Sequence, residues 1–465
     1  MDEVLTIVQL HEDTANAQLP TLTGQQQEVV AWVQSLDNNA WMLEIGESLS
    51  KGRQGLNLKS AELKINHSLT TDFSTWLLGE HGRFGSVLVL QLNYALEAIL
   101  FDDLDLYVLA PQGIQQGLSL ASLWGQLASN TLHTPGFGAS LKKYLESGPK
   151  FGGLNVSYHS PFHTMTFGHP GLLKYHLQGY DLRAKALVVK NHLWFQAAHL
   201  FPTVVSEAKE FTPTGRFLEL EAASPVFFCK VGDLYRLNNT EGHRLLDLAY
   251  LAVSTAYIPT VRNLLQLGDG AVKGLWVGLT SGKRQLLNEQ EVVLATVETL
   301  MDTGSLSCTF IDGWTGSSSL LEHGETTPST PAGYESHGAE ADACRDAINK
   351  RWPALKVRSL VGLPYEYKVA AGLLCSYSLT SAYTSSVIPA RVCSLPGVIH
   401  SSRVGRQMID MHIWRHSEFV PDELITDQLE PEADINPLDA DYMIDVNEYS
   451  RWLAALRRQQ ESRDF

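Results

Sequence analysis

The chain has 465 residues, of which 44% are hydrophobic, and its formal net charge is −16. Because a single hydrophobic core stops growing at about 250 to 300 residues, this length predicts two domains. The acidic balance excludes a surface that attracts nucleic acid by bulk charge, so we expect no nucleic-acid partner.

The five cysteines show no CxxC spacing and lie in apolar stretches, which is typical of buried thiols in a reducing compartment. The first residues, MDEVLTIVQLHEDT, are acidic where a signal peptide would be basic. No apolar run approaches the roughly 20 residues that a membrane span requires. The sequence therefore predicts a cytoplasmic protein without a transmembrane segment.

An N-terminal α/β domain is predicted over residues 1–239. Apolar periodicity and turn residues define its elements. We expect helices at residues 25–36, 86–100, 171–182 and 191–201, and strands at 41–45, 58–69, 103–111 and 184–190.

A second α/β domain is predicted over residues 240–416, after a helical stretch that Pro259 interrupts and that we interpret as a hinge. We expect strands at residues 274–280, 305–314, 355–362 and 375–386, with helices at 291–304, 339–352 and 366–374. This alternation predicts a doubly wound sheet, whose ligands lie at the carboxyl ends of the strands. Residues 317–337 are rich in Ser, Thr, Gly and Pro, which indicates a surface loop able to act as a lid.

The last part of the chain, residues 417–465, is predicted to be an acidic tail followed by an amphipathic helix. Tyr449, Trp452 and Leu456 follow helical spacing. Two placements are open for this helix, which either returns to the first domain or covers the second.

The strongest candidate site is the stretch Ser281-Gly282-Lys283-Arg284, which follows a predicted strand and precedes a predicted helix. Two cations beside a helix N-terminus favour phosphate binding, and an arginine guanidinium can hold a pyrophosphate with two hydrogen bonds. The GxxxxGK[ST] spacing of a Walker loop is absent. A solvated Lys-Arg turn explains the same residues equally well.

Two further segments lie at predicted strand ends. Asp312 precedes a glycine, where it either contacts a ligand or caps a turn. The hydroxyl-rich stretch 381–386 can hold a diphosphate without a metal, and it can equally be an ordinary Ser/Thr-rich strand end. Its candidate ligand-binding residues are Ser381, Thr384, Ser385 and Ser386.

In the first domain, His163 and His169 are candidates for a general base that acts on an acceptor hydroxyl. Their spacing also allows a metal pair, but no Cys or HExxH partner accompanies them, so we expect no metal. Ordinary hydrogen-bonded core or surface histidines are the alternative.

These segments together resemble a known family. The stretches GLWVGLTSGKRQLLNEQE, FIDGWTG and VRSLVGLPYEYKVAAGLLCSYSLTSAYTSSVIPARVCSLPGVIHSS resemble the donor half of glycosyltransferase-like proteins encoded in bacterial surface-polysaccharide loci. FGHPGLLKYHLQGYDL is similar to a Gly-His helix start in their first lobe. The resemblance covers residues 160 to 400 approximately. The chain departs from the pattern at Pro170 and Gly171, which follow the Gly-His pair where an aromatic and a polar residue are usual.

The resemblance implies a GT-B-like fold of two Rossmann-like α/β lobes with a cleft between them. The first lobe would face the acceptor and the second would bind the donor. It implies that Lys283 and Arg284 hold the phosphates of a nucleotide-sugar donor, that Asn288 and Glu291 line the same site, and that residues 381–386 close it.

The function implied is transfer of a sugar to a glycan, a lipid-linked glycan or a protein, with no cofactor beyond the nucleotide-sugar substrate. One alternative is a catalytically inactive GT-B-like protein that binds a glycan or a partner protein. Another is an enzyme on a different phosphorylated metabolite, such as an epimerase. The absence of a GxGxxG turn disfavours a dinucleotide-dependent version of the latter.

Overall fold

The computed structural model divides the chain into two units, Met1–Arg236 and Leu237–Phe465. In the first unit it describes residues 6–9, 22–36, 40, 43–45, 47, 56–70, 74–92, 95–101, 106–109, 150–155, 164–182, 186–190, 195, 197–205, 209–211 and 226–230. In the second unit it describes residues 240–280, 285–313, 334–382, 384–406, 416–428 and 440–463.

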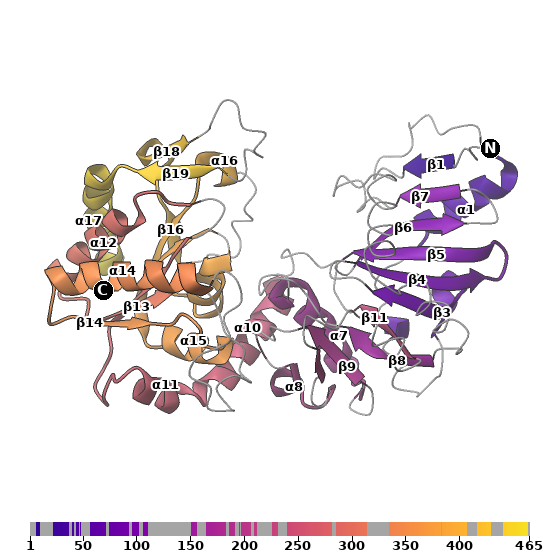
Figure 1. Ribbon diagram of the computed structural model, residues 1–465, viewed down its shortest axis with the longest axis horizontal. Coiled ribbons are helices and arrows are strands. Elements are labelled where there is room, and N and C mark those ends of the chain that lie inside the picture. The colour runs from indigo at the N-terminus through magenta and orange to yellow at the C-terminus, as the bar shows by residue number, and fades with distance from the viewer. Residues whose placement is uncertain are drawn as a thin grey trace. The chain divides into compact units, whose positions relative to one another are not determined.

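A seven-stranded sheet forms a large part of the first unit, with the strand order β1-β7-β6-β5-β4-β3-β2 (Figure 1). Strands β1 and β7 pair in parallel, and the other neighbours pair antiparallel. The strands are β1 (Thr6–Gln9), β2 (Leu56–Leu58), β3 (Leu63–Thr70), β4 (Ser74–His81), β5 (Gly85–Leu92), β6 (Ala95–Phe101) and β7 (Leu106–Leu109). The predicted helix at residues 25–36 is confirmed as α1 (Gly24–Gln34), which Thr23 and Gln26 begin with a capping box.

The predicted helix at residues 86–100 is wrong, because this stretch forms β5 and β6. Val87 and Val89 are buried while Ser86 is exposed, so the burial alternates with the period of a strand. A continuous apolar run hides this alternation, since leucine occupies the intervening positions. The strand predicted at residues 41–45 is also wrong, because residues 43–45 are helical.

A second sheet in the first unit is entirely parallel, with the order β10-β9-β8-β11. Its strands are β8 (Lys150–Asn155), β9 (Ala186–Lys190), β10 (Lys209–Phe211) and β11 (Val226–Lys230). The chain between β8 and β9 includes a π-helical turn, η4 (Thr164–Gly168), and α7 (His169–Leu177). The short helix α8 (Ala197–Leu200) follows β9. The first unit is therefore α/β, with an additional, largely antiparallel sheet that the sequence did not predict.

The second unit contains a six-stranded parallel sheet, which confirms the α/β class of the protein. Its order is β14-β13-β12-β15-β16-β17, and all neighbouring strands are parallel. The strands are β12 (Gly274–Gly278), β13 (Cys308–Asp312), β14 (Lys356–Ser359), β15 (Cys375–Ser381), β16 (Gly397–His400) and β17 (Ser417–Phe419). Each of the four strands predicted from the sequence for this unit is present.

The helices of the second unit form two packed groups, one of α12, α14 and α17 and one of α10, α11 and α15. The chain moves in one direction along the sheet from β12 through β13 to β14, and in the opposite direction from β14 to β15. Because parallel crossovers are right-handed, helices that connect strands in opposite directions lie on opposite faces of the sheet, so the two groups cover opposite faces. The bounds are α10 (Thr240–Thr255), α11 (Ile258–Leu264), α12 (Glu289–Asp302), α14 (Tyr334–Arg351), α15 (Tyr365–Gly372) and α17 (Val446–Arg463). Pro259 lies in the first turn of α11, so the predicted interruption of the helix is confirmed.

The described residues between 417 and 463 are integrated into the second unit. They supply β17 at the sheet edge and an antiparallel pair, β18 (Ile425–Gln428) and β19 (Asp441–Ile444). Tyr449 and Leu453 of α17 are fully buried in the core with residues of α12, so the second of the two placements for this helix is correct. Within the described residues, no helix has the length and apolar character needed to cross a membrane.

Candidate functional site

The strand order of the second unit creates a switch point between β12 and β15. From β12 the chain moves to β13 and β14 on one side, and then returns to β15 on the other side of β12. Ligands of open α/β sheets bind at such a point, outside the carboxyl ends of the strands. Gly278 ends β12 and Ser381 ends β15, so these two residues mark the candidate site.

Gly278 allows the turn after β15 to approach the end of β12 closely. A Cβ atom at this position would lie 3.0 Å from the Cβ of Ser385 and 3.0 Å from Cγ2 of Thr380. Contacts this short require the neighbours to move. Glycine therefore brings the hydroxyl-rich turn against the strand end. Gly278 is not among the site residues predicted from the sequence.

The hydroxyl groups of the turn form a local network. Ser385 Oγ lies 2.9 Å from Ser381 Oγ and donates to the Ser381 carbonyl at 3.2 Å. Ser386 is buried in the 3₁₀ turn η5 (Thr384–Ser386), which leads into the π-helical segment η6 (Val387–Val392). The structure describes the backbone of Thr384 but not its side chain. Three of the four predicted hydroxyls thus lie at the carboxyl end of β15.

Thr280 connects the end of β12 to the start of α12. Its backbone N–H and its hydroxyl both donate to Oε1 of Glu289, at 2.7 Å and 2.9 Å. Its Oγ1 also accepts the N–H of Leu286 at 3.1 Å. The two flanks of segment 281–284 are therefore joined through one threonine and one glutamate.

The same connection is also held by β19. The N–H of Gln285 donates to Oδ1 of Asp441 at 2.7 Å, and the N–H of Tyr442 donates to the Gln285 carbonyl at 3.0 Å. Asn288 donates to the Ile444 carbonyl at 2.7 Å and accepts the Ile444 N–H at 3.1 Å. The Asn288 amide thus has a structural role, while its contact with a donor stays a prediction. Glu291 is exposed in the first turn of α12.

Asp312 ends β13 and forms a buried ion pair with Lys368 of α15. The ammonium group of Lys368 also donates to the Gly313 carbonyl at 3.2 Å. Burial raises the pKa of Asp312 and lowers the pKa of Lys368, and their mutual attraction opposes both effects. Asp312 is therefore at the predicted edge of the sheet, and its carboxylate is engaged by Lys368, which is not among the predicted site residues.

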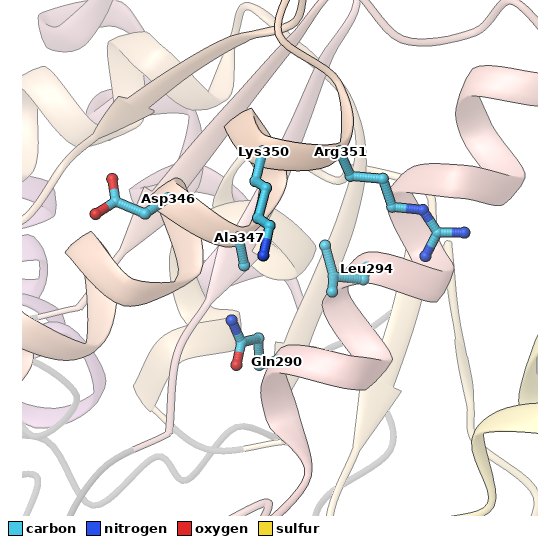
Figure 2. Close-up of a pocket in the computed structure, with 6 residues that line it drawn as sticks. All are labelled: Gln290, Leu294, Asp346, Ala347, Lys350 and Arg351. Carbon is cyan, nitrogen blue, oxygen red and sulfur yellow. The ribbon is translucent and has the colours of Figure 1, made fainter.

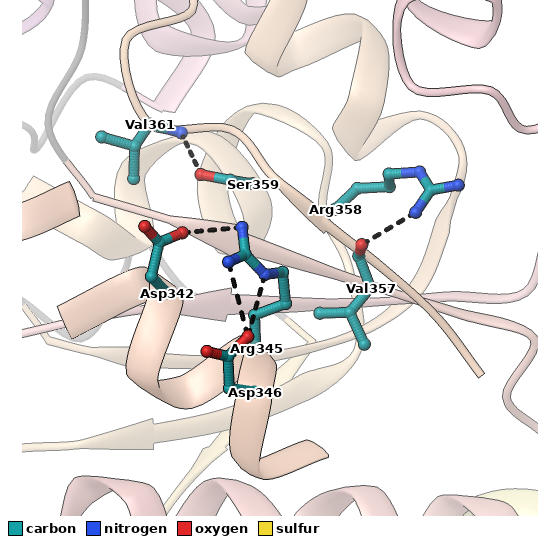
Figure 3. Close-up of polar contacts among 7 residues, drawn as sticks. All are labelled: Asp342, Arg345, Asp346, Val357, Arg358, Ser359 and Val361. Atoms are coloured by element: carbon teal, nitrogen blue, oxygen red, sulfur yellow. Dashed lines mark hydrogen bonds and ion pairs between the residues drawn. The ribbon is translucent and has the colours of Figure 1, made fainter. Parts of the chain in front are cut away.

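Two arginines near the β14 end of the sheet are engaged in protein contacts (Figure 3). Arg345 pairs with Asp342 at 2.7 Å and with Asp346 at 3.4 Å. Arg358 donates to the carbonyls of Leu265 and Val357. The guanidinium groups of both arginines are therefore already engaged by other groups of the protein.

A surface groove of 630 Å³ lies between α12 and α14 (Figure 2). It is lined by Gln290, Leu294, Asp346, Ala347, Lys350 and Arg351. Arg351 forms an ion pair with Glu298 at 2.5 Å. None of the predicted site residues that the structure describes lines this groove.

The remaining predicted residues lie in other places. His169, at the start of α7 in the first unit, is only 1% exposed. His163, Lys283 and Arg284 lie outside the described residues, as does most of the predicted lid, residues 317–337. Within the described residues, no group of three or more His, Cys, Asp or Glu side chains is arranged to hold a metal ion.

Simple sequence signals exist for only some of the residues that were missed. Gly278 lies at the end of a predicted strand, and Glu289 precedes the predicted helix 291–304 by two residues, although it lies in the first turn of α12. A glycine at the end of a buried strand is a recognisable sign of close backbone approach. Lys368, on an apolar helix, gives no such signal because its partner is 56 residues away.

No protein-family model matches the chain, and no curated protein matches it. Among solved structures, the chain is similar to the ADP-heptose lps heptosyltransferase II of E. coli, with 13% sequence identity and a TM-score of 0.36. The match covers 66% of this chain and 99% of the other. This degree of similarity does not assign the chain to a family.

Proposed function

We propose that the protein is a glycosyltransferase whose second unit binds a nucleotide-sugar at the β12–β15 switch point. The observation that carries this proposal is the close approach of Ser385 to Gly278, which gathers hydroxyl groups at the carboxyl edge of a parallel sheet. Crevices at this position are the usual ligand sites of open α/β sheets.

Phosphate binding is supported by the β12–α12 connection. Lys283 and Arg284 belong to the short segment that joins the end of β12 to the N-terminal end of α12. Cations and a helix N-terminus both stabilise phosphate charge. In the proposed reaction the two cations stabilise the leaving diphosphate, and no cofactor or metal is required beyond the nucleotide-sugar.

The acceptor in this proposal is a hydroxyl group of a glycan, a lipid-linked glycan or a protein. His163 or His169 would act as the general base. His169 is 1% exposed, so a base role for it requires a rearrangement of α7 that admits the acceptor. His163 is therefore the first candidate to test.

A non-catalytic binding protein is the second candidate function. Two observations favour it: the Asp312 carboxylate is neutralised by Lys368, and His169 is buried. Such a protein would still bind a nucleotide or a glycan, but it would not turn over a nucleotide-sugar.

A thermal-shift screen with UDP, GDP, CMP, TDP and their common sugars tests the donor site. A ligand at 100 times its dissociation constant stabilises the fold by about 2.7 kcal/mol, which raises Tm by several degrees. The Arg284→Ala and Lys283→Ala variants should lose the shift. Lys273→Ala is the matched control, because Lys273 is exposed directly before β12, at the opposite edge of the sheet.

Either result of the screen is informative. A shift that Arg284→Ala abolishes and Lys273→Ala retains supports the donor site, and release of nucleotide from the bound sugar then separates enzyme from binding protein. No shift with any nucleotide, from a folded sample, contradicts the glycosyltransferase proposal.

A further inference from the structure

Glu289 has an unusual position for an acidic residue beside a proposed phosphate site. A single carboxylate oxygen, Oε1, accepts both hydrogen bonds from Thr280, whose hydroxyl oxygen accepts the N–H of Leu286. The connection between β12 and α12 is thus ordered on both flanks by this carboxyl group.

The surroundings of Glu289 disfavour its negative charge. Burial raises the pKa of Glu289 to about 7, the two hydrogen bonds from Thr280 oppose this effect, and the Glu340 carboxylate on α14 adds to it. The Cys344 thiol, also on α14, faces Glu289 as well. In the described part of the chain, no cationic side chain pairs with Glu289.

We propose that Glu289 is a positioning residue of the nucleotide site, which orders the β12–α12 connection through Thr280 and takes up a proton from solvent when a nucleoside diphosphate binds. This inference rests on the proposed function. A phosphate anion bound beside this connection repels the negative charge of an ionised Glu289. Binding of the phosphate therefore favours protonation of Glu289, and protonation favours binding. The protonated carboxyl group keeps Oε1 as an acceptor, so the hydrogen bonds from Thr280 persist.

The linkage has a definite sign. Above pH 7, where the free protein carries an ionised Glu289, binding requires uptake of a proton, so affinity falls as pH rises. Uptake of one proton raises Kd by at most about tenfold for each unit of increase in pH. Glu289→Gln keeps the Oε1 acceptor without the charge, so its affinity should be independent of pH between 7 and 8.5 and should exceed that of the wild type at pH 8.5.

The test is isothermal titration with UDP, GDP and TDP from pH 7 to 8.5, in buffers of different ionisation enthalpy that reveal proton uptake. Wild type should take up a fraction of a proton near pH 7, and Glu289→Gln should take up none. Glu340→Gln is the matched control: it removes the neighbouring charge, so the pH profile should move to lower pH and keep its slope.

A pH dependence of affinity that remains in Glu289→Gln overturns the proposal, as does one that disappears only in Glu340→Gln.

The positioning role of Glu289 is tested separately, in the protein without nucleotide. Glu289→Ala should speed hydrogen exchange at the amides of Thr280 and Leu286, and Glu289→Gln should restore slow exchange; equal exchange in all three proteins overturns it. If none of the three nucleotides binds wild type, the proposed function and proton uptake fail together, while exchange still decides the positioning role.

Discussion

Asn288 exchanges two hydrogen bonds with the backbone of Ile444, which lies 156 residues further along the chain. The side chain of a residue at the start of α12 thereby fixes strand β19 beside the proposed donor site. The C-terminal part of the chain is thus a support for the β12–α12 connection rather than an appendage to it.

Asn288→Ala should lower the free energy of unfolding of the second unit by about 2 kcal/mol, because two partly buried hydrogen bonds worth about 1 kcal/mol each are lost. Urea denaturation measures this change. Asn447→Ala, at an exposed position on α17, is the control and should be nearly neutral. Unchanged stability in Asn288→Ala would show that the amide does not hold β19.

Gly278→Ala should destabilise the second unit by about 1–3 kcal/mol, because the new methyl group overpacks the contact with Ser385 and Thr380. It should also weaken nucleotide binding. Gly270→Ala is the matched control, since a Cβ at Gly270 meets no atom within 4 Å. Thermal unfolding and the nucleotide screen measure the two effects.

The double variant Gly278→Ala/Ser385→Gly identifies the cause. Removal of the Ser385 Cβ should recover part of the lost stability, because that atom is one of the two in closest contact. If the single and double variants lose the same stability, the contact with Ser385 is not the source of the destabilisation.

Local sequence pattern was sufficient to predict most of the second unit. The five residues of β12 are all buried and α12 has a buried apolar stripe, so each element carries its own signal. In residues 86–100 the pattern failed, because two apolar strands that follow each other closely in the sequence have nearly the composition of a buried helix.

Only those contacts of the candidate site that join residues close together in the sequence were predictable. Ser381 and Ser385 lie four residues apart, and their hydroxyl groups meet as the sequence suggests. The partners of Asn288 and Asp312 come from segments 156 and 56 residues away, and no local periodicity encodes such pairs. Two of the candidate ligand residues, Asn288 and Asp312, are therefore engaged by distant parts of the fold.

The stability of the second unit should fall as pH decreases below about 6.5, partly because of His400 at the end of β16. Burial lowers the pKa of His400 to about 3, and its Nδ1 lies 2.7 Å from the hydroxyl oxygen of Tyr442. The unfolded chain therefore binds a proton that the folded chain excludes. The contribution of His400 to the free energy of unfolding is complete above pH 6.5. It is lost as the pH falls toward 3, at about 1.4 kcal/mol per pH unit.

The difference between wild type and His400→Asn isolates this contribution from other titrating groups. Urea denaturation at pH 7 and pH 5 should show a smaller loss of stability in His400→Asn. His416→Asn, at an exposed position before β17, controls for the loss of a histidine. Parallel pH profiles for wild type and His400→Asn would exclude His400 as the source.

Lys368→Met should be among the most damaging single substitutions in the second unit. It leaves the Asp312 carboxylate buried without its cation, and breaking a buried pair in this way costs about 3–5 kcal/mol. The double variant Asp312→Asn/Lys368→Met removes both charges and should be more stable than Lys368→Met alone. The exposed pair Arg351–Glu298 is the control, because Arg351→Ala should cost no more than about 1 kcal/mol. If the double variant is as unstable as Lys368→Met, loss of packing rather than the uncompensated charge explains the damage.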